Sequence, residues 1–376
     1  MTVVPGSLSL RRFSAPRVAA GGREWLRCLA DGAGAALAGT LLWLAVGLWL
    51  ALYPALAPAL VNQRAPGPAL DDFGVFYAAA RMVRDGRGDE IYDIDAIVRE
   101  EARVYGRSVE QTPVLPYFNP PAFAGALVPL TWLPPGVAAS VFLALTTCAL
   151  AAGLALLWKR SRLGIPGAWV AGGMLAAFQP VRDTLFHGQP SFLLFFAFAT
   201  SFVAFASRRE RLAGALLGLL LLKPNYALVP LAVLLWKRRW AALGGFVSVA
   251  TVWFAISIAA SGFSSIWTYP AFLWRAASWD NANGISIAGM FGWNGVVRTL
   301  LGPGQHDAVN AWSAALAIPT LALVAVAFAG PWDTRGRAFA ARYGAIVLAS
   351  VLVNPHVYRQ DVVVAAVPAL LLLGAT

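Results

Sequence analysis

The sequence predicts an all-α, polytopic integral membrane protein. Apolar residues make up 59% of the 376-residue chain, and charged residues make up only 12%. Soluble domains carry about 25% charged residues. Stretches such as 135–158 and 241–260 are apolar and long enough to cross a hydrocarbon core about 30 Å thick. From the number of such stretches we expect about ten transmembrane helices.

The net charge of +11 also follows from membrane topology. The basic residues occur in short clusters between apolar runs, at 11–12, 23–27, 159–162, 208–211, 237–239 and 335–342. Cytoplasmic loops carry such an excess of Lys and Arg under the positive-inside rule. Because no basic groove with interleaved aromatic residues is visible, we exclude nucleic acid as a partner.

The chain begins with a basic leader, residues 1–32, which we expect in the cytoplasm. The apolar run 33–61 is longer than the roughly 7–15 residues of a cleaved signal peptide. It is therefore interpreted as a retained signal anchor and the first span of a single transmembrane domain, residues 33–376. Cys28 and Cys148 have no metal-ligand spacing, and we expect no disulfide between them.

Residues 62–119 form the first external loop in this topology. Within it, 72–85 predicts an amphipathic helix, because apolar residues recur three and four residues apart while Arg81 and Arg84 take the other face. A second polar helix is expected over 94–105. Helices of this type lie on the membrane surface.

The apolar segment 120–133 ends at a proline pair and is either re-entrant or a short tilted span. A complete crossing there would place the basic cluster 159–162 on the wrong side of the membrane. Later spans are expected at 135–158, 165–178, 189–206, 212–222, 225–236, 241–260, 308–328, 343–353 and 361–373. The polar connections left outside are 181–190, the second large external loop 261–307, and 354–360.

The segment 212–236 has a basic cluster at each end, so both ends should be cytoplasmic. Pro224 disfavours helix at Lys223 in its middle, which predicts a hairpin with Lys223 at the tip. A lysine near the bilayer centre costs about 2.5–3.5 kcal/mol on insertion scales. A lipid phosphate would offset that cost, or the lysine snorkels to the outer headgroups.

The other polar connections fall on the same predicted face as Lys223. One contains Arg182, Asp183, His187 and Gln189, and the other contains Asn354, His356, Tyr358, Arg359, Gln360 and Asp361. Each is an ordinary solvated turn when taken singly, so their convergence is the evidence for a site. Asp72, at the start of the first loop helix, is either a helix N-cap or a base. The Asn-, Gly- and Trp-rich segment 278–294 is typical of sugar-contacting loops and equally of interfacial ones. The scattered His residues favour no metal site.

Five segments together resemble glycosyltransferase family 87 over residues 70–373. They are DDFGVFYAAARMVRDGRGDEIYD (71–93), YFNPPAFAGALVPLTWLPP (117–135), HGQPSFLLFF (187–196), RLAGALLGLLLLKPNYALVPLAVLLWKRRW (211–240) and NPHVYRQDVVVAAVPALLLL (354–373). The resemblance implies a GT-C-type fold with interfacial helices in the first external loop. It implies transfer of mannose or another hexose or pentose from a polyprenyl-phosphate donor to a lipid- or glycan-linked hydroxyl. The reaction would invert the anomeric carbon at the external face of a bacterial inner membrane, without a cofactor.

The resemblance also suggests roles for individual residues. Asp72, or else its neighbour Asp71, matches the family's general base. The expected ligands of the donor phosphate are Lys223, Arg182, His356 and Arg359. The expected substrate contacts are Tyr77, Arg81, His187, Gln189, Asn281, Asn283 and Asp361. The runner-up is a polyprenyl-linked sugar or lipid transporter, which would explain broken helices and intramembrane charge but predicts inverted repeats that we do not see. A noncatalytic scaffold would leave Lys223 without a purpose.

Overall fold

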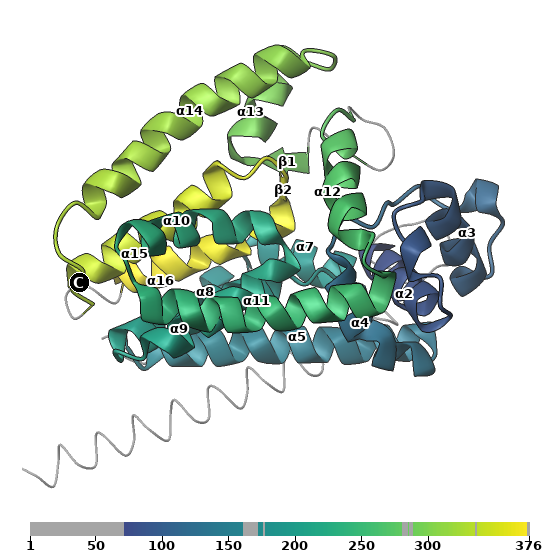
Figure 1. The fold of residues 1–376 in the computed structure, drawn as a ribbon, viewed down its shortest axis with the longest axis horizontal. Helices are drawn as coiled ribbons and strands as arrows, with labels where there is room; N and C mark the ends of the chain where they lie inside the picture. Colours follow the sequence, from purple (N-terminus) through teal and green to yellow (C-terminus); the bar gives the residue numbers. More distant parts are fainter. Residues whose placement is uncertain are drawn as a thin grey trace, which may run out of the picture. The chain divides into compact units, whose positions relative to one another are not determined.

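The computed structural model describes residues 71–160, 172–175, 177–279, 285, 289–334 and 337–373 (Figure 1). The basic leader, the first span, most of the expected span 165–178, and Asn281 and Asn283 lie outside the described residues. The backbone of Asp71 is described, but its side chain is not. The described part is almost entirely helical, as the sequence predicts.

In the described part of the chain, eight helices form the bundle. They are α5 (Pro135–Trp158), α8 (Ser191–Ala206), α9 (Glu210–Gly218), α10 (Leu228–Trp236), α11 (Trp240–Ser261), α14 (His306–Ala327), α15 (Arg337–Leu352) and α16 (Ala366–Leu373). Among the described residues, α5, α11 and α14 are long and apolar enough to cross a membrane, and four further apolar helices are shorter. These helices support a membrane protein, while a total of about ten spans stays a prediction.

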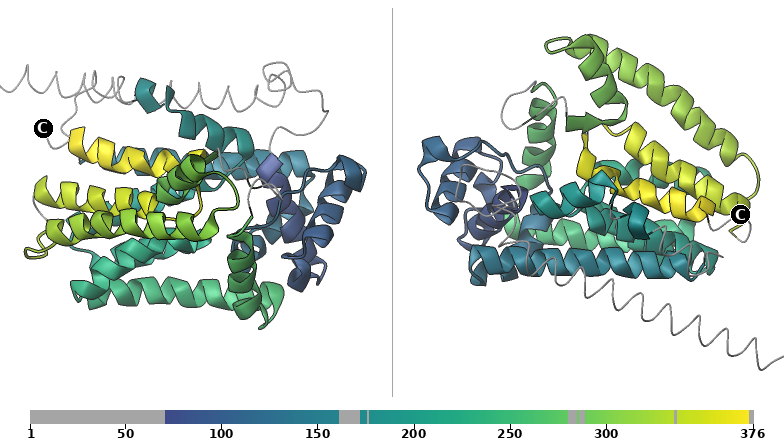
Figure 2. Two further views of the ribbon diagram at one scale, coloured as in Figure 1. Left: turned by 90° about the horizontal axis from the view of Figure 1, so that it is seen from above. Right: turned by 180° about the vertical axis from the view of Figure 1, so that it is seen from behind.

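The remaining helices and a two-stranded sheet lie mainly at one end of the bundle, here called the loop end (Figures 1 and 2). They are α2 (Asp71–Arg84), η1 (Gly88–Glu90), α3 (Ile94–Tyr105), η2 (Val109–Gln111), α4 (Pro121–Leu127), η3 (Val128–Trp132), α7 (Gln179–His187), α12 (Ser265–Ala276), α13 (Gly292–Leu301) and η7 (Arg359–Ala365). Strand β1 (Met290–Phe291) pairs antiparallel with β2 (Val357–Tyr358), with Met290 opposite Tyr358. The opposite end carries Lys237 and its basic neighbours and is called the basic end.

The predicted hairpin around Lys223 is confirmed. Helix α9 continues into η4 (Leu219–Leu222), and after Lys223 the chain enters η5 (Pro224–Ala227) and α10. Glu210 at the start of α9 forms an ion pair with Arg239, the residue before α11, so both ends of the hairpin meet at the basic end. Helices α9 and α11 then run in parallel.

Glycines allow this close parallel contact between α9 and α11. A Cβ added to Gly214 would lie 1.7 Å from the carbonyl oxygen of Ala242, and one added to Gly245 would lie 1.9 Å from that of Arg211. Because no side chain fits at either position, the two backbones touch directly, as small residues permit in membrane helices. This contact holds α9, the first arm of the hairpin, against α11.

The segment 120–133 is two short pieces, the seven-residue α4 and the five-residue η3. At 1.5 Å and 2.0 Å per residue they span about 20 Å together, less than a hydrocarbon core of about 30 Å. Helix α4 packs on the last turns of α11, where the backbone N–H of Ala122 donates to Ser257 Oγ at 3.2 Å. The segment therefore stays near the loop end, and the re-entrant alternative is the one that the geometry favours.

The bounds expected for the two loop helices agree with α2 and α3, but their expected setting does not. Phe73, Phe76 and Tyr77 are at most 5% exposed, and Ala78 to Ala80 are fully buried. Residues 73–80 of α2 are thus buried by protein, so this helix turns no apolar face to a membrane surface, while Arg84 at its end is exposed. The amphipathic pattern was read correctly, but its polar face meets another helix.

Helix α3 covers that polar face through Glu100, which is only 2% exposed. Its carboxylate pairs with Arg81 at 3.4 Å, with Arg87 at 3.3 Å and with Arg103 at 3.0 Å. A Cβ on Gly74 would lie 1.9 Å from the Tyr105 hydroxyl, so this glycine also lets α3 approach α2. The two helices thus pack as one unit.

We predict that Glu100→Gln destabilises the protein by about 1–3 kcal/mol, because the buried side chain then leaves three arginines without their shared carboxylate. This loss of stability is smaller than that expected for a fully buried ion pair, since the arginines are partly exposed. Thermal unfolding of the purified protein measures the change. Glu110→Gln, on the exposed η2, is the control and should leave the midpoint unchanged; an equal shift in both variants would contradict the role of Glu100.

Candidate functional site

Four side chains from distant parts of the sequence form a continuous hydrogen-bonded polar chain at the loop end. Gln189 Nε2 donates to Asp72 Oδ2 at 2.8 Å, and Lys223 Nζ donates to Gln189 Oε1 at 3.3 Å. Lys223 Nζ also contacts both carboxylate oxygens of Asp361, at 2.7 and 2.9 Å. The structure therefore brings together four residues that the sequence singled out.

Lys223 is presented by the break between η4 and η5. Its backbone is extended, with φ −137° and ψ 85°, because Pro224 disfavours the helical conformation in the residue before it. The break frees the carbonyl oxygen of Leu222, which accepts a hydrogen bond from Asn119 Nδ2 at 3.1 Å. A residue that the sequence did not single out, Asn119, thus stabilises the hairpin tip.

Gln189 is placed by the end of α7. Gly188 closes that helix with φ +65°, a left-handed conformation that glycine adopts without strain. The backbone N–H of Gln189 then donates to the Thr184 carbonyl oxygen at 3.0 Å. The turn directs the Gln189 amide between Asp72 and Lys223, where it donates to one and accepts from the other.

Asp361 is the anchor of the polar chain. It is 1% exposed, and it accepts a hydrogen bond of 2.6 Å from Ser191 Oγ in addition to its contacts with Lys223. The anionic partner of Lys223 is therefore a carboxylate of the protein itself, where the sequence suggested a lipid phosphate. Asp361 is thus the counter-ion of Lys223, and the substrate contact expected of it stays a prediction.

A second ion pair joins α7 to η7 beside the polar chain. Arg359 Nε lies 3.3 Å from Asp183 Oδ2, and Gln179 Nε2 donates to the other oxygen of Asp183 at 2.7 Å. Asp183 is buried, whereas 53% of the Arg359 side chain is exposed. Arg182, next to Asp183 on α7, is also exposed. Two cations are thus held at the surface of the loop end.

His356 lies in the turn that precedes β2. Its backbone N–H donates to Asn354 Oδ1 at 3.0 Å, and its ring packs 5.0 Å from Phe118 and 5.1 Å from Tyr358. Burial, together with the nearby charge of Lys223, lowers the pKa of His356 to about 4. The imidazole is neutral at physiological pH, so it can donate a hydrogen bond to a phosphate but brings no positive charge.

An aromatic wall adjoins His356. Phe118 packs 5.4 Å from Phe272 and 6.2 Å from Trp279, and Phe272 packs 5.8 Å from Trp279. Phe118 and Trp279 are partly exposed, whereas Phe272 is buried. Sequence reasoning noted the Trp-rich segment that contains Trp279 but did not single out Phe118, because no local pattern marks Phe118 as a neighbour of Trp279 and His356.

Other expected site residues are not brought to the polar chain. Tyr77 is buried, and its hydroxyl donates to the Leu133 carbonyl oxygen at 2.8 Å. Arg81 pairs with Glu100. Tyr77 and Arg81 therefore both serve the packing of α2. His187 ends α7 and contacts Phe186. Within the described ranges, no group of three His, Cys, Asp or Glu residues is arranged to hold a metal ion.

The lowered pKa of His356 predicts a pH-dependent stability. The unfolded chain binds the proton near pH 6.5 and the folded chain only near pH 4, so acidification over this window favours unfolding. The stabilisation is fully present above about pH 6.5 and is lost towards pH 4, on the order of 3 kcal/mol. His356→Gln should make the thermal unfolding midpoint less dependent on pH over this window, and Tyr358→Phe should leave that dependence unchanged. Identical pH slopes in His356→Gln and the parent protein would contradict the assignment.

Comparison with known proteins agrees with this geometry. The family model for glycosyltransferase family 87 matches residues 117–355, a range that includes Gln189 and Lys223 and lies between Asp72 and Asp361. No curated protein and no solved structure matches the chain. Since the match extends over more than half of the sequence, the chain belongs to glycosyltransferase family 87 and is a membrane glycosyltransferase.

Proposed function

We propose that the protein transfers a sugar from a polyprenyl-phosphate donor to a hydroxyl group of a lipid- or glycan-linked acceptor, with Asp72 as the general base. The observation that carries this proposal is the polar chain, which fixes one partly exposed carboxylate by hydrogen bonding to Gln189. The sugar would be mannose or another hexose or pentose. The loop end would face the periplasm of a bacterial inner membrane, because the basic end carries the positive-inside signal.

The reaction needs a base on the acceptor side. As the acceptor oxygen attacks the anomeric carbon, the bond from that carbon to the phosphate oxygen breaks and the configuration inverts. Asp72 takes the proton that the acceptor hydroxyl loses. Gln189 acts as a positioning residue, since its amide nitrogen donates to Oδ2 of the Asp72 carboxylate and so fixes its orientation.

The leaving group is a phosphate monoester anion, so no general acid is required. Its developing charge needs stabilisation by preorganised positive groups and N–H donors. Arg359 and Arg182 are exposed cations at the loop end, and the neutral His356 supplies a further donor. Lys223 directs its Nζ at three oxygens of Asp361 and Gln189, so we assign it mainly to positioning.

The aromatic wall supports a sugar site next to this phosphate site. Phe118 and Trp279 offer ring faces beside His356. Aromatic rings pack well against the apolar faces of sugars while neighbouring polar groups bind their hydroxyls. A ring surface, cations and a carboxylate at one end of the described bundle support the proposal, because glycosyl transfer from a lipid phosphate would use such groups.

We predict that Asp72→Asn lowers the turnover number by about 10²–10⁴-fold, the usual contribution of a general base. The amide keeps the shape of the carboxylate, so binding of the lipid-linked donor should persist. The measurement is sugar transfer by the full-length protein in nanodiscs, with radiolabelled polyprenyl-phosphate sugars and a membrane-lipid extract as acceptor.

Asp85→Asn, at the other end of α2, is the matched control and should keep full activity. Gln189→Leu should give an intermediate loss, because Asp72 remains but is no longer held. Full activity of Asp72→Asn would exclude this residue as the base. Movement of the labelled donor across sealed vesicles without any transfer product would favour the transporter.

A further inference from the structure

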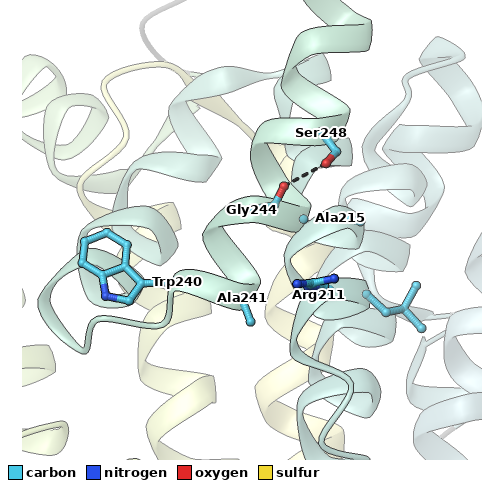
Figure 3. Close-up of a pocket in the computed structure, with 8 residues that line it drawn as sticks. Arg211, Ala215, Trp240, Ala241, Gly244 and Ser248 are labelled. Atoms are coloured by element: carbon cyan, nitrogen blue, oxygen red, sulfur yellow. Dashed lines mark hydrogen bonds between the residues drawn. The ribbon is translucent and has the colours of Figure 1, made fainter.

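A groove opens at the basic end, far along the bundle from the polar chain. It has a volume of about 680 Å³ and lies between the first turns of α9 and α11 (Figure 3). Its lining residues are Arg211, Leu212, Ala215, Trp240, Ala241, Gly244, Gly245 and Ser248. A second cavity of about 550 Å³ shares Arg211, Leu212 and Ala241 with it and adds Arg208, Arg209 and Glu210. The two form one depression, here called the basal groove.

The basal groove is strongly positive. Arg208, Arg209 and Arg211 line it and are exposed. Glu210 is the single acid among the lining residues, and Arg239 forms an ion pair with it. The parallel helices α9 and α11 both begin here, so the positive ends of two helix dipoles add to the arginine charge. Charge complementarity therefore calls for an anionic ligand.

The rest of the groove surface is apolar and faces outward. Trp240 is 66% exposed at its rim, and Leu212 is 45% exposed on the α9 side. Helix α11, which continues from the groove, is one of the helices apolar enough to span a membrane, and only 17% of its central window is buried. Away from the arginines the lining is apolar apart from Ser248, whose hydroxyl already donates to the Gly244 carbonyl oxygen at 2.9 Å, so the ligand must have an apolar part as well.

Gly244 shows that the groove is not a by-product of helix packing. A Cβ added to its neighbour Gly245 would clash with the Arg211 carbonyl oxygen, whereas one added to Gly244 meets nothing within 4 Å. Glycine in a helix interior is destabilising relative to alanine. The packing of the protein thus explains Gly245 but not Gly244, whose missing side chain keeps the groove open (Figure 3).

We propose that the basal groove binds an anionic phospholipid. The headgroup phosphate lies against Arg208, Arg209 and Arg211, and an acyl chain runs over Gly244 and Ser248 along α11. Basic pockets between membrane helices on the cytoplasmic side recognise anionic headgroups in this way. The site is separate from the proposed glycosyl transfer and does not depend on it.

Native mass spectrometry of the full-length protein tests the proposal, with phosphatidylglycerol and phosphatidylcholine of identical acyl chains as probes. The parent protein should retain phosphatidylglycerol at least tenfold better. Replacing one of the three arginines by glutamine should lower retention of phosphatidylglycerol about fivefold, since each basic residue near anionic lipid contributes about 1 kcal/mol. Replacing all three should remove the preference for phosphatidylglycerol.

Gly244→Phe keeps every arginine but fills the groove, and it should also lower retention of phosphatidylglycerol at least tenfold. The helix gains propensity from this change, so a folding defect is not expected. Arg342→Gln on α15 is the charge-matched control and should retain the lipid fully. Equal retention of both lipids by the parent protein, full retention by Gly244→Phe, or equal losses in Arg342→Gln and single arginine variants of the groove would each overturn the proposal.

Discussion

The ion pair between Lys223 and Asp361 is the interaction on which the arrangement of the loop end depends. Lys223 stands at the tip of a hairpin made of apolar helices, and Asp361 is 1% exposed. Either charge alone would be strongly unfavourable in such a setting, so each requires the other. Their contact brings η7 onto the hairpin, and the bonds to Ser191 and Gln189 follow from it. Asp72 is held at the end of this chain of contacts.

The two ends of the bundle handle charge differently. At the loop end, acids and bases are paired through buried contacts, such as those of Glu100 and Asp183, which leaves rigid helices to present a few polar groups. Rigid support of this kind is what a catalytic carboxylate needs for a defined geometry. At the basic end, arginines outnumber acids and remain exposed around a groove. The first arrangement suits chemistry on a bound substrate, and the second suits contact with a charged membrane surface.

Sequence reasoning recovered the features that depend on local pattern. The hairpin around Lys223 followed from the basic clusters at 208–211 and 237–239, and the bounds of α2 followed, within one residue, from its periodicity. It missed the burial of α2, because an amphipathic pattern is the same whether the polar face meets water or another helix. It also could not pair Lys223 with Asp361, since a sequence separation of 138 residues leaves no local signal. The contacts that form the aromatic wall could not be predicted for the same reason.

A double-mutant cycle on Lys223 and Asp361 tests the central role of this ion pair most directly. We expect Lys223→Met alone to lower the free energy of unfolding by about 2–4 kcal/mol, because a buried carboxylate loses its counter-ion. Adding Asp361→Asn should restore most of that stability, since the uncompensated charge is removed. Transfer activity should stay low in the double variant, because Gln189 and Asp72 are no longer held. Additive losses of stability in the double variant, or full activity of Lys223→Met, would contradict the account.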